Sequence, residues 1–139
     1  MSFTETEMEQ LKTSYETLRS GAAQHPGAFY DALFSRAPEL RPMFREDLEG
    51  QGMKFMTTLG VVLARLRDED AVDPQFQELG AKHAALGVRA KHFAPMEEAL
   101  IETIRDELGS GFSPGLEALW RKAFRMIAAR MIRRGDIPD

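Results

Sequence analysis

The segment 78–88, which reads ELGAKHAALGV, places a single histidine among small and apolar residues. Pro74, directly after Asp73, predicts the start of a helix before this segment, and Gly87 predicts its end. Four side chains in and beside the segment recur at helical spacing and predict one buried stripe: Phe76, Leu79, His83 and Leu86. The histidine is therefore expected on the apolar face of a helix.

A lone histidine on such a face has two interpretations. It is either a partly buried core residue with one ring nitrogen hydrogen-bonded to a backbone carbonyl, or a metal ligand. A neutral imidazole on a rigid helix with apolar neighbours is what haem iron needs as an axial ligand. A ligand of that kind needs an acceptor for its second ring nitrogen, and the carbonyl of Leu79 lies one turn before His83. Periodicity alone leaves both interpretations open.

The rest of the chain also has helical patterns. Thr4 and Glu7 form a capping-box pattern that opens a first helix, for which Gly21 predicts the end. Ser113 followed by Pro114 predicts the start of the last helix. The remaining helices are expected at 26–37, about 47–67 and 94–108, with a short turn or 3₁₀ segment at 38–44. Since no useful length alternates with a period of two, the sequence predicts an all-α protein.

Length and composition exclude several classes of function. The 139 residues suit one domain, covering 1–139, and 43% hydrophobic residues indicate an ordinary globular protein. A net charge of −4 does not favour nucleic acid or acidic membranes as partners. The absence of cysteine excludes disulfides, thiolate metal sites and thiol nucleophiles. We expect a cytoplasmic protein, since neither a signal peptide nor a long apolar run is present, and a monomer or weak homodimer.

Three segments together resemble the globin family. LGAKHAALGV at 79–88 resembles its proximal segment, and FYDALFSRAPELRPMF at 29–44 resembles its second and third helices. QGMKFM at 51–56 lies where the distal helix crosses the pocket, and the 32 residues from Gln51 to His83 agree with the family's spacing. The chain is most similar in kind to single-domain bacterial haemoglobins and to the globin half of flavohaemoglobins. This resemblance implies the globin fold, a three-over-three helical sandwich around a haem pocket.

The resemblance also implies a set of site residues. His83 matches the proximal ligand of the iron, while Tyr30 and Gln51 match the two distal residues that face bound gas. The resemblance leaves the sixth ligand of ferric iron open between Tyr30, Lys54, water and none. The positions that match haem-binding residues are Phe44, Lys54, Phe55, Leu79, His83, Val88, Phe93 and Met96.

The implied function is reversible binding of oxygen, nitric oxide and carbon monoxide by haem b, with oxygen transport as a role. Oxidation of nitric oxide to nitrate is a further implied activity, and it needs an external reductase because no dinucleotide-binding motif is present. Two departures bear on it. Phe93 stands where flavohaemoglobins have a tyrosine, and their late carboxylate has no match around Gly135 and Asp136. Strong activation of the O–O bond is therefore not expected.

Two alternatives stay open. A haem-based gas or redox sensor, or a partner-binding globin, would use the same haem to change an interaction surface. A haem-free structural globin would leave His83 as a core residue. Detection of a partner that binds one haem state only would favour the first alternative, and a protein that stays colourless with added haem would favour the second.

Overall fold

The computed structural model describes residues 3–25, 27–44, 48–66 and 74–139. Within these ranges every regular element is helical and no strand occurs, so the predicted all-α class is confirmed. The elements are α1 (Glu5–Gln24), α2 (Ala28–Arg36), the 3₁₀ segment η1 (Pro38–Met43), α3 (Leu48–Ala64), α4 (Pro74–Ala85), η2 (Ala90–His92), α5 (Phe93–Leu108), η3 (Gly109–Gly111) and α6 (Pro114–Gly135).

Local signals start the first and last helices where the sequence predicts. The Thr4 hydroxyl accepts a hydrogen bond from the Glu7 N–H at 3.0 Å, and the Glu7 carboxylate accepts one from the Thr4 N–H at 2.9 Å. This reciprocal pair is the predicted capping box. At α6, the Ser113 hydroxyl accepts from the Leu116 N–H, and Pro114 occupies the first turn, where its missing N–H costs nothing.

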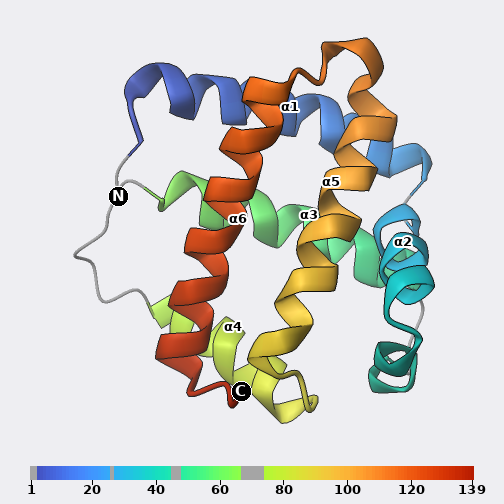
Figure 1. Cartoon of the computed structure of the whole chain (residues 1–139), viewed down its shortest axis with the longest axis vertical. Coiled ribbons are helices and arrows are strands. Elements are labelled where there is room, and N and C mark those ends of the chain that lie inside the picture. The colour runs from blue at the N-terminus through green and yellow to red at the C-terminus, as the bar shows by residue number, and fades with distance from the viewer. Residues whose placement is uncertain (1–2, 26, 45–47, 67–73) are drawn as a thin grey trace.

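The helices form two crossing layers (Figure 1). In the view of Figure 1, α5 and α6 run side by side in front, α3 crosses behind them, and α1 lies across one end. The most extensive pairings join α4 to α6 and α2 to α5. Buried side chains of all six α-helices fill the space between the layers, among them Leu18, Leu33, Leu63, Phe76, Ile104 and Trp120. This arrangement agrees with the predicted globin fold.

One predicted helix end is wrong. Helix α1 continues past Gly21 to Gln24. A β-carbon at Gly21 would overlap the carboxylate of Glu107 on α5, so this glycine leaves room for the end of that side chain and does not end the helix. Glycine can end a helix or make room for a neighbouring group, and the local sequence does not distinguish between these two roles.

The predicted buried stripe of α4 is correct only in part. Phe76 is buried, while Leu79 and His83 are half-buried. Leu86 is 46% exposed, because α4 ends at Ala85 and helical periodicity no longer applies beyond it. Gly87 follows with a φ of +92°, a conformation that favours glycine and agrees with the predicted stop.

Several predicted boundary residues lie outside the described residues: Pro26, Asp47, Arg67 and Asp73. No helix in the described ranges is both long enough and apolar enough to cross a membrane.

Candidate functional site

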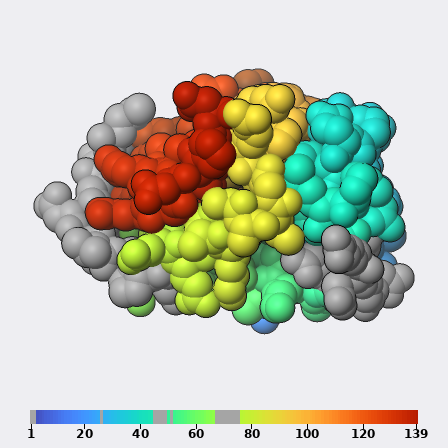
Figure 2. All heavy atoms as spheres, turned by 90° about the horizontal axis from the view of Figure 1, so that it is seen from below, coloured from blue at the N-terminus to red at the C-terminus, as the bar shows by residue number. Residues whose placement is uncertain are grey.

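His83 lies on α4, and its side chain is partly buried. Phe76, one of the largest fully buried side chains, anchors the first half of the helix in the core. Figure 2 shows α4, the turn that follows it and the C-terminal part of α6 side by side on one face of the molecule. His83 therefore belongs to a helix that packs against α6 and that begins with a buried anchor.

One nitrogen of the His83 imidazole is hydrogen-bonded to the backbone. Its Nδ1 lies 2.7 Å from the carbonyl oxygen of Leu79, one turn earlier, as expected from the sequence. A carbonyl oxygen can only accept, so Nδ1 carries the proton and donates. In the neutral ring the lone pair then lies on Nε2, and this is the form in which imidazole binds a metal.

Burial keeps that ring neutral. Desolvation lowers the pKa of His83 below its ordinary value of 6.5, and the hydrogen bond to Leu79 opposes this shift only in part. At neutral pH, protons consequently do not compete for Nε2.

The predicted proximal wall contacts the histidine through an aromatic ring. The centroids of the His83 and Phe93 rings are 6.3 Å apart and their planes are 29° apart. Phe93, Val88 and Met96 are buried, whereas Leu79 packs on the core but is only partly buried. The imidazole thus has an apolar aromatic neighbour in Phe93.

Tyr30, one of the two predicted distal residues, lies in an aromatic cluster with Phe44 and Phe55, two of the predicted haem-binding residues. The Tyr30 ring lies 5.2 Å from that of Phe44 and 6.4 Å from that of Phe55. Phe29 stacks on Phe55 with centroids 4.4 Å apart, and Phe34 lies 5.5 Å from Phe44. Tyr30 is 5% exposed, whereas Phe44 and Phe55 remain partly exposed. The structure thus brings together three of the predicted residues, from α2, α3 and the residue after η1.

The other two predicted residues on this side of the molecule are Gln51 and Lys54, both on α3. Gln51 belongs to α3, but its side chain lies outside the described part of the structure. Lys54 lies on α3 and is exposed, so it is not part of the aromatic cluster.

These residues fit a haem group. Among the described residues, no group of three or more histidine, aspartate or glutamate side chains could hold a metal ion, so His83 offers a single nitrogen donor. Haem needs only such an axial donor, because its own ring supplies the other ligands of the iron. Phe44, Phe55 and Leu79 are apolar yet incompletely covered, as expected of side chains that would pack against a flat apolar cofactor.

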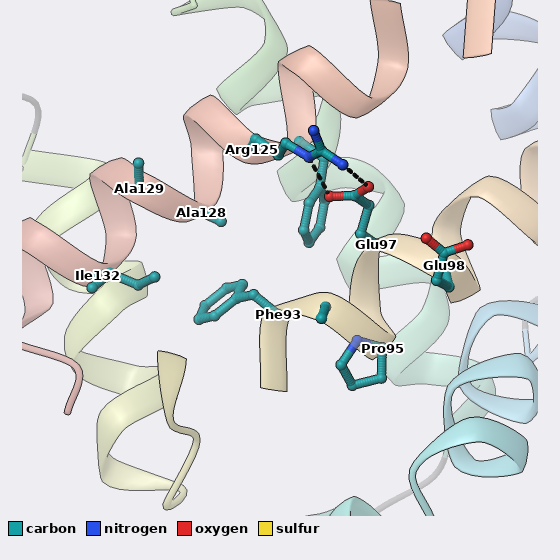
Figure 3. A pocket seen from close by; sticks show the side chains of 10 residues that line it. Phe93, Pro95, Glu97, Glu98, Arg125, Ala128, Ala129 and Ile132 are labelled. Atoms are coloured by element: carbon teal, nitrogen blue, oxygen red, sulfur yellow. Dashed lines mark hydrogen bonds and ion pairs between the residues drawn. The ribbon is translucent and has the colours of Figure 1, made fainter. Parts of the chain in front are cut away.

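A separate hollow of about 600 Å³ lies between α5 and α6 (Figure 3). Phe93 lines this hollow as well as packing against His83, although His83 is not among the lining residues. The hollow is lined by Phe93, Ala94, Pro95, Glu97, Glu98, Phe124, Arg125, Ala128, Ala129 and Ile132.

An ion-pair cluster at the edge of this hollow joins α5 to α6. The buried carboxylate of Glu97 accepts hydrogen bonds from Arg121 Nη1 at 2.7 Å and from Arg125 Nε at 2.9 Å (Figure 3 shows the bonds from Arg125). Burial alone would raise the pKa of Glu97, but the hydrogen bonds from the two arginines outweigh it and lower that pKa. Local sequence patterns do not reveal this cluster, because Arg121 and Arg125 lie 24 and 28 residues from Glu97.

Comparison of the sequence with known proteins finds a match to one protein family. The Globin family model matches residues 27–131 of the chain, which include the aromatic cluster and His83. A flavohemoprotein of Bacillus subtilis is 26% identical, over 90% of this chain and 32% of its own length. A leghemoglobin of Psophocarpus tetragonolobus is 27% identical, over 93% of this chain and 95% of its own length. An anaerobic nitrite reductase of Oryza sativa is 25% identical, over 93% of both chains. The chain spans about a third of the flavohemoprotein and nearly all of the other two.

Proposed function

The chain belongs to the globin family, and we propose that it binds haem b through His83 and reversibly binds oxygen and other diatomic gases. The observation that carries this proposal is the hydrogen bond from His83 Nδ1 to the Leu79 carbonyl, which leaves Nε2 of a neutral ring as a donor to iron. The family and the haemoprotein names of its relatives support a haem cofactor.

When bound, haem supplies an iron atom that binds diatomic gases and transfers some electron density to them. The part of the chain is to hold and orient this group. We propose that Leu79, Val88, Phe93 and Met96 cover its proximal side, and that Phe44 and Phe55 pack against its other face. Their apolar surfaces exclude water, which protects ferrous iron from oxidation and strengthens any hydrogen bond made inside the pocket.

Tyr30 and Gln51 are the proposed hydrogen-bond donors to the gas. The burial of Tyr30 beside Phe44 and Phe55 supports this role, since its ring belongs to the same cluster as the two proposed haem-packing phenylalanines. Each donor is expected to stabilise a partly negative ligand by about 1–2 kcal/mol, which would slow oxygen release by roughly one to three orders of magnitude for the pair. Such a site favours tight retention of oxygen over rapid delivery.

A second activity included in the proposal is the conversion of nitric oxide to nitrate. The overall reaction, NO + O₂ + e⁻ → NO₃⁻, takes one electron from outside, and we propose that a separate reductase supplies it. The resemblance of Tyr30, Gln51 and His83 to the site residues of flavohaemoglobins is the reason for proposing this activity. It is tested by the consumption of nitric oxide by the oxygenated protein, with and without a reductant.

The gas-binding proposal is tested by reconstituting the protein with haem, reducing it without oxygen and then mixing it with oxygen. The expected result is an oxygen complex that releases its ligand slowly and reversibly when carbon monoxide displaces it. Immediate conversion to the ferric state, with no oxygen complex, would contradict reversible binding. The double variant Tyr30→Phe, Gln51→Leu is expected to release oxygen faster, and an unchanged rate would contradict the distal roles.

A further inference from the structure

Two glycines allow the backbones of α4 and α6 to touch. A β-carbon at Gly80 would lie 2.8 Å from the α-carbon and 2.9 Å from the nitrogen of Gly135, and it would overlap the carbonyl oxygen of Met131. A β-carbon at Gly135 would lie 2.7 Å from the nitrogen of Ala81 and would overlap the backbone of Gly80. A side chain at either position therefore requires the two helices to move apart.

This contact lies next to the acceptor of the histidine. The carbonyl of Leu79 and the nitrogen of Gly80 belong to the same planar peptide group, so the one cannot be displaced without the other. That carbonyl accepts the hydrogen bond from His83 Nδ1 at 2.7 Å. A shift of Gly80 away from α6 thus moves the group that orients the imidazole.

The turn after α4 is attached to the same end of α6. The Ala90 N–H donates to the carbonyl of Pro138 at 2.8 Å, and the Val88 N–H donates to the carbonyl of His83 at 3.1 Å. Ile137 is buried directly after α6. The segment from Gly80 to Ala90, with His83 near its middle, is consequently held to the C-terminal residues at both ends.

Glycine at both positions is not explained by helix formation. Gly80 lies inside α4 and Gly135 is the last residue of α6, and alanine would favour either helix more. Their benefit is the close approach itself, which brings the α4 backbone nearer to α6 than any side chain would allow.

We propose that Gly80 and Gly135 are positioning residues for His83. Their backbone contact holds the peptide group of Leu79 and Gly80 in place against α6, and the carbonyl of that group accepts from Nδ1 and so fixes the tautomer and the orientation of the ring. The part of this inference that concerns iron rests on the proposed function, because it takes His83 as the axial ligand.

The test compares Gly80→Ala and Gly135→Ala with two control glycines. Gly115→Ala lies on α6 with no contact closer than 4.0 Å, and Gly60→Ala on α3 meets the Tyr15 ring, away from α4. Gly60→Ala thus introduces a comparable steric overlap without displacing α4, the helix that carries His83.

The first readout uses the haem-free protein. Nuclear magnetic resonance of the His83 ring is expected to show a proton on Nδ1 whose exchange with water is slowed by the hydrogen bond. In Gly80→Ala and Gly135→Ala this protection should fall by about two- to tenfold, the effect of losing one hydrogen bond. The two control variants should retain it. Equal protection in all folded variants, or an equal loss in Gly60→Ala, would overturn the proposal.

The second readout uses the haem-loaded protein. Both positioning variants should release haem about 10–100-fold faster, the usual effect of losing a group that orients a metal ligand. They should also lower the iron–imidazole stretching frequency of the ferrous form. Unchanged haem release and an unchanged frequency would overturn the link to iron. Failure of the wild-type chain to bind haem would contradict the proposed function. The exchange rate of the His83 Nδ1 proton in the haem-free protein would still show whether the glycines position His83.

If neither alanine variant folds, the proposal is tested on the wild-type protein. A nuclear Overhauser contact between the α-protons of Gly80 and Gly135, together with a protected Nδ1 proton on His83, supports the proposal. Absence of that contact overturns it.

Discussion

His83 donates its Nδ1 proton to the carbonyl oxygen of Leu79, one helical turn earlier, across 2.7 Å. Because the acceptor is a backbone group, its presence does not depend on which side chain occupies position 79. A neutral backbone acceptor also gives the ring less negative character than a carboxylate would. The proposed site is thereby suited to gas binding more than to cleavage of the O–O bond.

Tyr30→Phe is expected to raise the oxygen dissociation rate by about tenfold, since it removes a donor that contributes about 1–2 kcal/mol. Stopped-flow displacement of oxygen by carbon monoxide measures this rate. Carbon monoxide carries less negative charge when bound, so its own dissociation rate should change less.

Tyr15→Phe is the matched control, as the chain has only these two tyrosines. The Tyr15 hydroxyl donates to the carbonyl of Met56 at 2.6 Å in the contact between α1 and α3. Its loss should reduce the free energy of unfolding by about 1 kcal/mol and leave oxygen release unchanged. Equal oxygen release in the wild type and Tyr30→Phe would contradict the role of Tyr30.

Glu97→Gln is expected to reduce the free energy of unfolding at pH 7 by about 1–3 kcal/mol, because it weakens charged hydrogen bonds to Arg121 and Arg125. Urea unfolding followed by circular dichroism measures this difference. Glu98→Gln is the control: its carboxylate is half-exposed and bonds to Arg121, so it should cost less than about 1 kcal/mol.

The effect of Glu97 should also depend on pH in a definite direction. Its pKa is lowered in the folded chain, so the carboxylate stabilises the fold above the ordinary value of 4.5, and this contribution is lost as pH falls through the folded pKa. The difference between wild type and Glu97→Gln should therefore shrink in acid. A difference that stays constant from pH 7 to the acid limit would contradict the ion-pair explanation.

His92 is expected to make the haem-free protein less stable below pH 6.5. Its buried Nδ1 accepts a hydrogen bond from the Arg89 N–H at 2.9 Å, and protonation would remove that acceptor. Burial, with a contribution from Lys91, lowers the pKa of His92 below 6.5. Above pH 6.5 the ring is neutral whether the chain is folded or unfolded. Below it the unfolded chain binds the proton first, so the free energy of unfolding falls with pH.

Two variants separate titration from hydrogen bonding at this position. His92→Asn keeps an acceptor oxygen near the place of Nδ1 but cannot titrate, so the loss of stability between pH 6.5 and 5 should become shallower. His92→Ala should show the same shallower slope and a lower stability at pH 7. If urea unfolding gives the wild-type slope for both variants, the titration of His92 is not the cause.

Helix starts could be predicted from the sequence because their signals are local. The Thr4–Glu7 box and the Ser113–Pro114 pair act within one helical turn, and the structure confirms both. The predicted burial of Leu86 is wrong because periodicity does not show where a helix ends. The identity of the acceptor for His83 could be predicted for the same reason as the caps, since Leu79 lies four residues away on the same helix.

Long-range contacts could not be predicted in this way. Gly21 has the local appearance of a helix stop, and only the position of Glu107 shows that it leaves room for that carboxylate. The approach of Gly80 to Gly135 and the bonds from Glu97 to the two arginines join residues on different helices. The pattern of a single sequence contains no signal for such pairs, although a glycine inside a helical pattern marks a position where another backbone can approach closely.

The most direct test of His83 as the haem ligand is the visible absorption spectrum of the protein with added haem, reduced with dithionite and then exposed to carbon monoxide. The wild type is expected to show a Soret band of five-coordinate ferrous haem that shifts when carbon monoxide binds. His25→Gly, at a side chain that is 68% exposed, should give the same spectrum. His83→Gly should lose this band and regain it when imidazole is added. A wild-type spectrum without a Soret band, or an unchanged one in His83→Gly, would contradict ligation by His83.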